Sequence, residues 1–147
     1  YWISPYAEKI RAILGFKGLA WKSVEIPIVA PKPDLVALTG GYRKTPVLQI
    51  GADVYCDTDC IAAVLEHLQP EPSLFPAGAA GAGLMLGAWQ QELFMTAVLL
   101  AGATTDVFPP GFVEDRATMF EGGFDVERIL SGLPAQRDHL RAKLSIV

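Results

Sequence analysis

Residues that build metal centres and disulfide frameworks are scarce in this sequence. Its 147 residues include two cysteines, Cys56 and Cys60, and two histidines, His67 and His139. Two cysteines are too few for a disulfide framework, which fits a reducing compartment and favours buried, chemically quiet thiols. The histidines lie far apart, with neither a ligand set nor a nucleophile beside them. We therefore expect no metal site and no histidine-based catalytic triad.

The chain also lacks an excess of positive charge. Lysine and arginine total 12 against 16 aspartate and glutamate residues, which gives a net charge of −4, and no basic run appears. A nucleic-acid surface needs clustered basic residues to neutralise phosphates. Nucleic acid is therefore not an expected partner.

No apolar run is long enough to predict a membrane span. The most apolar stretch, GAAGAGLMLGAWQQELFMTAVLLAGA, is interrupted by Gln90, Gln91 and Glu92, whereas a span needs about 18 consecutive apolar residues. The stretch therefore predicts a core helix, and no membrane partner. Because no basic-then-apolar leader is present either, we expect a globular, cytoplasmic protein.

The first stretch, WISPYAEKIRAIL, predicts a helix that runs to about Phe16. Ser4 stands where a helix N-cap is expected, and Pro5 falls at the first helical position, where a missing N–H costs nothing. Ile10 and Leu14 recur at the spacing of one helical face. Ser4 is therefore, at the least, a cap.

A strand and a short helix are predicted next. In AWKSVEIPI, Val24, Ile26 and Ile28 alternate and would share one face of a strand. The following loop contains a short helical segment, with Asp34 placed to cap it and Gly40 to end it.

A hairpin and a second amphipathic helix complete the first part. TPVLQIGADVYCD predicts two short strands joined at Gly51, Ala52 and Asp53. Asp57 and Thr58 stand at the N-cap of the next helix. Its predicted inner face consists of Ile61, Val64, Leu65 and Leu68. This order of elements predicts an α/β fold around a mixed sheet.

The second part is predicted to be all helix. Three prolines in LQPEPSLFPAGAAGAG mark the boundary, so we expect domains at 1–73 and 74–147. Residues at helical spacing predict one helix through Leu86, Trp89, Leu93, Ala97 and Leu100. A second helix is predicted through Leu133, Arg137, Leu140, Leu144 and Val147, with Pro134 near its start. The last pattern is still helical at the final residue, so we expect this helical domain to be incomplete.

Four stretches together resemble the cytosolic glutathione transferases: SPYAEKIR, GLAWKSVEIP, GYRKTPVLQIG and DTDCIAAVLEHL. They occur in the order and spacing of that family and cover residues 1 to about 76. The resemblance, nearest to serine-type, tau- or omega-like members, implies a thioredoxin-like glutathione-binding domain followed by the beginning of the family's helical domain. It also implies a homodimer.

The resemblance implies a chemical role for Ser4. A hydroxyl at a helix N-terminus can donate to the sulfur of glutathione while the helix dipole favours the thiolate, which is the reactive form. Tyr1 and Tyr6 are alternative donors. Glutaredoxins carry cysteines where this chain has Ser4 and Ala7, so dithiol exchange at this position is excluded.

The other binding residues are also implied by the resemblance. Thr45 and Pro46 match the family's cis-proline dipeptide, whose preceding residue pairs with the middle of glutathione. Lys44, or alternatively Arg43, would meet the glycyl carboxylate.

Asp57 and Thr58 match the acidic-hydroxyl pair that holds the γ-glutamyl end of glutathione. Backbone amides at a helix start and a hydroxyl can accept a carboxylate, while Asp57 can offset the ammonium group. A plain helix cap is the alternative for both residues.

The expected activity is therefore transfer of glutathione, without a metal, to a small hydrophobic electrophile, as in detoxification. Trp89, Phe94 and Met95 are candidates for the electrophile site, although core packing explains the same spacing. The alternative function is a non-enzymatic regulatory or interaction module, because the fold alone does not confer chemistry.

Overall fold

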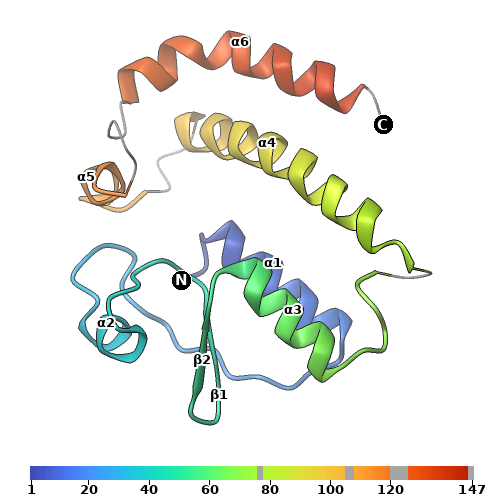
Figure 1. The fold of residues 1–147 in the computed structure, drawn as a ribbon. Coiled ribbons are helices and arrows are strands. Elements are labelled where there is room, and N and C mark those ends of the chain that lie inside the picture. The colour runs from blue at the N-terminus through green and yellow to red at the C-terminus, as the bar shows by residue number, and fades with distance from the viewer. Residues whose placement is uncertain (76–77, 105–107, 120–125, 146–147) are drawn as a thin grey trace. The chain divides into compact units, whose positions relative to one another are not determined.

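The computed structural model describes residues 1–75, 78–104, 108–119 and 126–145. The chain divides into two compact units, Tyr1–Pro76 and Ala77–Val147, which are coloured blue to green and yellow to red in Figure 1. The sequence places the boundary after residue 73, three residues earlier.

The first helix, α1 (Pro5–Phe16), begins as its sequence predicts. Ser4 is the N-cap, in extended conformation, and Pro5 occupies the first turn. Ile10 and Leu14 are buried on the predicted face. Local capping and amphipathic spacing are thus sufficient to define this helix.

The predicted hairpin is confirmed. Strands β1 (Val47–Ile50) and β2 (Asp53–Cys56) pair antiparallel. Asp53, expected in the turn, instead begins β2 opposite Ile50.

The strand predicted over AWKSVEIPI is wrong. Residues 20–27 have no regular secondary structure, Ile28 lies in a bend, and Val24 is 82 % exposed. A strand requires a neighbour for its N–H and C=O groups. Within the described residues the sheet contains only β1 and β2, so it is antiparallel, not mixed, and offers this segment no partner.

The short helix α2 (Pro33–Thr39) ends as predicted but begins two residues earlier than expected. Lys32 is its N-cap residue, so Asp34 lies in the first turn and does not cap the helix. Gly40 adopts φ +66° at the C-cap, a left-handed conformation that glycine reaches without steric cost.

Helix α3 (Thr58–Leu68) packs against α1. Ile61 and Leu65 are buried and form one core cluster with two residues of α1, Ile10 and Leu14. Leu68, expected on the inner face, is 54 % exposed because it occupies the last turn, beyond this cluster.

Two ion pairs show that α1 and α3 run in the same direction. Lys9, early in α1, contacts Asp59 early in α3, and Lys17, just after α1, contacts Glu66 late in α3. The two helices lie side by side in Figure 1. Their N-termini therefore lie at the same end of the first unit.

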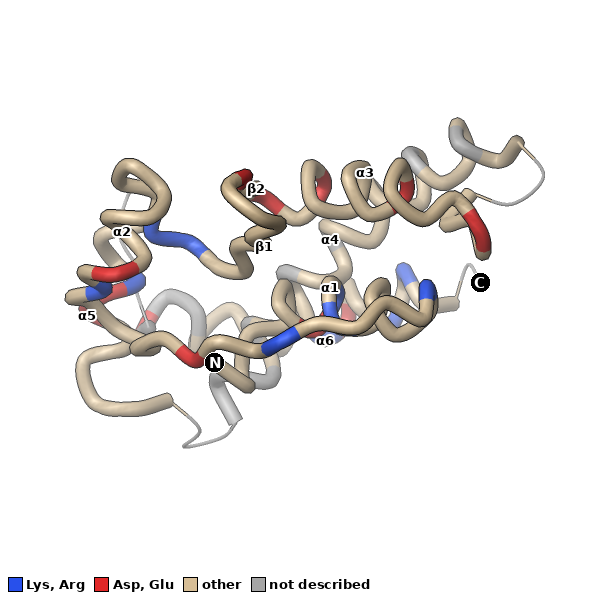
Figure 2. The backbone as a smooth tube through the Cα atoms, turned by 90° about the horizontal axis from the view of Figure 1, so that it is seen from below, with Lys and Arg blue, Asp and Glu red and all other residues tan. Residues whose placement is uncertain are grey.

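The second unit is helical where it is described, as predicted. Helix α4 (Ala80–Thr104) packs against α6 (Val126–Leu144), and α5 (Phe112–Ala117) lies between them in the chain. Glu92 is the only charged residue of α4, and the segments of α4 that are not grey in Figure 2 are tan. Among the described residues no helix has the length and apolar character needed to cross a membrane.

The start predicted for the last helix is wrong. Pro134 lies inside α6 rather than near its beginning. Proline removes one backbone hydrogen bond but leaves the helix on either side free to form, and packing against α4 stabilises α6. Val147, the final residue of the predicted face, lies outside the described residues.

Candidate functional site

The candidate site is built at the end of the first unit where α1 and α3 begin. The parallel packing of these helices brings Ser4, the N-cap of α1, and Asp57, the N-cap of α3, to this end. Helix N-termini present unpaired N–H groups and favour negative charge. Two such termini at one end suit an anionic ligand.

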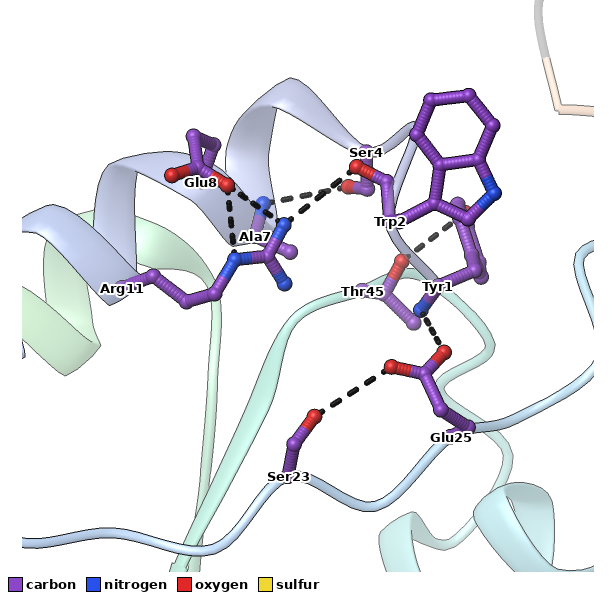
Figure 3. A network of polar contacts seen from close by, with 9 residues as sticks. All are labelled: Tyr1, Trp2, Ser4, Ala7, Glu8, Arg11, Ser23, Glu25 and Thr45. Carbon is purple, nitrogen blue, oxygen red and sulfur yellow. Dashed lines mark hydrogen bonds and ion pairs between the residues drawn. The ribbon is translucent and has the colours of Figure 1, made fainter.

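The Ser4 hydroxyl caps α1 and keeps its hydrogen for another partner. Ser4 Oγ accepts a hydrogen bond from the Ala7 backbone N–H at 3.2 Å, as Figure 3 shows. The cap therefore uses a lone pair of the oxygen. Because a serine hydroxyl also carries one donor hydrogen, capping and donation to a ligand are compatible.

Thr45 lies next to the segment that leads into Ser4. Thr45 Oγ1 donates to the Tyr1 hydroxyl at 3.0 Å, and the Ser4 backbone N–H donates to the Tyr1 carbonyl at 3.4 Å. Both Tyr1 and Thr45 are labelled in Figure 3. The Thr45–Pro46 peptide bond is cis, as expected. The structure thus brings the dipeptide and the serine together through Tyr1.

Asp57 joins β2 to α3 in a conformation that L-residues rarely adopt. Its φ is +73° and its ψ is 137°, the only positive φ among the described non-glycine residues. Its Oδ1 accepts the Asp59 N–H at 2.8 Å, so Asp57 caps the helix as predicted. Strained backbone of this kind concentrates at ligand sites and is stabilised by its surroundings.

Thr58 follows as the first residue of α3, with a hydroxyl that is already in contact with a cation. Lys9 Nζ lies 3.3 Å from Thr58 Oγ1 and 2.7 Å from Asp59 Oδ1. Lys9 was not predicted as a site residue, because contacts between residues about fifty positions apart leave no local pattern.

Lys32 is a second cation that was not predicted from the sequence. It is only 5 % exposed, and its Nζ lies 5.0 Å from the centroid of the Tyr1 ring, in cation–π geometry. Through Tyr1 it is connected to Thr45. Lys44, the predicted cation, is exposed, and Arg43 is half-buried. The available signal for Lys32 was its place between two prolines, Pro31 and Pro33, which restrict the backbone around it.

Tyr42 also belongs to this region. Burial raises the pKa of its phenol above the ordinary value, and the nearby Asp57 carboxylate and Cys56 thiol act in the same direction. A hydrogen bond with the Asp57 backbone opposes them. Tyr42 therefore stays protonated and packs beside the strained residue.

The two cysteines are not equally buried, which corrects the expectation for Cys60. Cys56 is half-buried, and burial raises the pKa of its thiol. Cys60 is exposed, because it precedes the buried Ile61 and faces away from the core. Among the described residues no group of three or more potential metal ligands comes together.

The remaining candidates lie elsewhere. Tyr6 is half-buried in the first turn of α1. Trp89 and Phe94 are half-buried on α4, in the second unit. The Met95 side chain lies outside the described part of the structure.

Comparisons with known proteins identify the type of the first domain. Residues 1–73 match the family described as glutathione S-transferase, N-terminal domain. The chain is 44 % identical to a GST-like protein from Pseudomonas syringae of known crystal structure, with a TM-score of 0.58. The match covers 99 % of this chain and 46 % of that protein. The comparison with curated proteins gave no match. Residues 1–73 therefore form a thioredoxin-like domain of the glutathione S-transferase N-terminal type.

Proposed function

We propose that this protein binds glutathione and activates its thiol for transfer to a small hydrophobic electrophile. The observation that carries the proposal is the place of the Ser4 hydroxyl: it caps α1 with a lone pair, keeps a hydrogen to donate, and lies at the end of the unit where α3 also begins. The match of residues 1–73 to the transferase domain supports glutathione as the substrate.

Ser4 would act by lowering the pKa of the bound thiol. A free thiol has a pKa of about 8.5 and is mostly protonated at neutral pH. A hydrogen bond from Ser4 to the sulfur and the positive end of α1 both favour the thiolate. The thiol proton passes to water, and the thiolate attacks a carbon of the electrophile. The C–S bond forms either as a leaving group departs with its electron pair, or as a C=C bond opens and its other carbon takes a proton from water.

The other residues would hold the peptide. The Thr45 backbone would pair with the cysteinyl part of glutathione, beside Pro46. Thr58 and the first N–H groups of α3 would receive the γ-glutamyl carboxylate, and Asp57 would receive the ammonium group. For the electrophile, Trp89, Phe94 and Met95 stay the candidates that the sequence offers, and the functional protein would be a cytoplasmic homodimer.

The glycyl carboxylate has two candidate partners, Lys44 and Lys32. We favour Lys32, because a buried ammonium beside the Tyr1 ring is less hydrated than an exposed one. Lys32→Met should raise the KM for glutathione more than Lys44→Met does. A larger effect at Lys44 would assign the role to Lys44 as the sequence predicts, and equal effects would overturn the preference for Lys32.

The principal test separates the donor role of Ser4 from its cap role. Ser4→Gly keeps an acceptable N-cap residue but has no hydroxyl, whereas Ser4→Thr keeps both functions. Glutathione affinity is measured by calorimetry, and the pKa of the bound thiol by its absorbance against pH. Ser4→Gly should bind glutathione with nearly unchanged affinity, raise the thiol pKa and lower kcat/KM by about 100-fold.

Two results would overturn this assignment. If Tyr1→Phe raises the thiol pKa and Ser4→Gly does not, the phenol is the donor. If the wild-type protein binds no glutathione at millimolar concentration, the transferase function is wrong and the non-enzymatic module becomes the better hypothesis.

A further inference from the structure

Lys9 connects α1 to the first turn of α3 through its ammonium group. Nζ donates to Asp59 Oδ1 at 2.7 Å and to Thr58 Oγ1 at 3.3 Å. The Lys9 and Asp59 side chains keep 42 % and 88 % of their surface exposed. Because ion pairs this exposed add little to folding stability, the contact matters chiefly for its effect on neighbouring groups.

The contact with Thr58 determines what that hydroxyl offers a ligand. An ammonium group only donates hydrogen bonds, so Thr58 Oγ1 acts as the acceptor toward Lys9. The single hydroxyl hydrogen of Thr58 is then left to point at another acceptor. Thr58 is thereby oriented to donate to an anionic oxygen.

The contact with Asp59 changes the charge that an anion would meet. Asp57 and Asp59 both lie at the start of α3, and Asp57 Oδ1 already accepts the Asp59 N–H. Two carboxylates oppose the favourable field of the helix N-terminus. Lys9 compensates the charge of Asp59 at 2.7 Å, so an approaching carboxylate meets less repulsion.

We propose that Lys9 is a positioning residue for the α-carboxylate of a γ-glutamyl compound at the first turn of α3. The inference rests on the proposed function, since it takes glutathione as the ligand. Lys9 acts through Thr58 and Asp59 and takes no part in thiol activation. It therefore contributes to substrate affinity and not to the chemical step.

Lys9→Met keeps the length of the side chain and removes its charge. We expect the KM and the dissociation constant for glutathione to rise about fivefold, the size of one charge interaction across a few ångströms of water, while kcat and the thermal unfolding temperature stay unchanged. Lys9→Arg should restore most of the affinity. Lys22→Met, at an exposed lysine of the extended segment, is the control for removing one positive charge.

Two further measurements separate a positioning role from a general structural one. Adding Asp59→Asn to Lys9→Met should recover much of the lost affinity, because the repulsive carboxylate is then gone. A glutathione analogue with γ-aminobutyryl in place of γ-glutamyl lacks the carboxylate, so wild type and Lys9→Met should bind it equally.

The outcomes that contradict the inference are distinct from those that contradict the function. If wild type binds glutathione and Lys9→Met binds it as tightly, or if Lys22→Met weakens binding to the same extent, the role of Lys9 is overturned and the transferase proposal stands. The role of Lys9 is also overturned if Lys9→Met weakens binding of the analogue as much as it weakens binding of glutathione. If wild type binds neither compound, both proposals fail.

Discussion

The Lys17 ammonium group, fully buried, lies 2.6 Å from the Glu66 carboxylate. It also donates to the backbone carbonyls of Gln69 at 2.6 Å and Pro72 at 3.1 Å. Glu66 in turn accepts the Ser73 hydroxyl at 2.6 Å and a backbone N–H of the same segment. One ion pair thus fastens the ends of α1 and α3 to the chain that leads out of the first unit.

Breaking this pair should destabilise the protein, and removing both charges should destabilise it less. Lys17→Met leaves the Glu66 carboxylate without its buried counterion and removes the Lys17 hydrogen bonds to two backbone carbonyls. We therefore expect the thermal unfolding temperature to fall by about 10 °C. The double variant Lys17→Met/Glu66→Leu should recover part of that loss. Calorimetry of the two variants checks this, and equal unfolding temperatures for wild type and Lys17→Met would contradict it.

The same pair predicts a loss of stability in acid. Hydrogen bonds from Lys17, Ser73 and the Leu74 backbone lower the pKa of Glu66 from 4.5 to about 2. When folding lowers the pKa of a group, its ionised form stabilises the native state at every pH above the pKa of that group in the unfolded chain. This stabilisation is lost as the pH falls through the pKa of the group in the folded protein. The stability difference between wild type and Glu66→Gln should therefore be constant above pH 4.5 and shrink toward pH 2. Denaturant unfolding at several pH values measures it, and a difference independent of pH would exclude Glu66 as the cause.

Two glycines should respond to alanine in opposite directions. Gly15 lies within α1 and has open space where the methyl group of an alanine would extend, so Gly15→Ala should stabilise the protein by about 0.5–1 kcal/mol. Gly40 has φ +66°, so Gly40→Ala forces a left-handed conformation on alanine and should cost about 1–2 kcal/mol. Chemical denaturation gives both values. A stabilised Gly40→Ala variant would show that α2 does not end as described.

The two thiols should differ in reactivity. Cys60 is exposed. The pKa of the Cys56 thiol is raised, mainly by burial and to a smaller extent by the charge of Cys60. A chromogenic disulfide reagent should therefore modify Cys60 first, and Cys60→Ser should abolish the fast phase. Cys56→Ser serves as the matched control and should leave it unchanged. A fast phase that disappears only in Cys56→Ser would reverse the assignment.

Local features of the chain were predictable because neighbours in sequence produce them. The cap at Ser4, the end of α2 at Gly40 and the hairpin each depend on a few adjacent residues. The predicted strand through Val24 and Ile26 failed for the opposite reason: alternation indicates a possible strand, but only a neighbouring strand makes it one. Leu68 similarly has the helical spacing of a core residue and lies beyond the core.

The sequence alone was enough to predict α1, α3, the end of α2, the helical course of α4 and the hairpin, since caps, turns and periodicity are local properties. It also supplied Ser4, Thr45, Asp57 and Thr58 as candidate site residues. Only the tertiary structure placed α1 parallel to α3, which brings two helix N-termini to one end. It alone paired Lys9 with Asp59 and Lys17 with Glu66 and buried Lys32 beside Tyr1. Such contacts join residues far apart in the chain. The sequence around one charged residue does not indicate which distant residue will contact it in the folded protein.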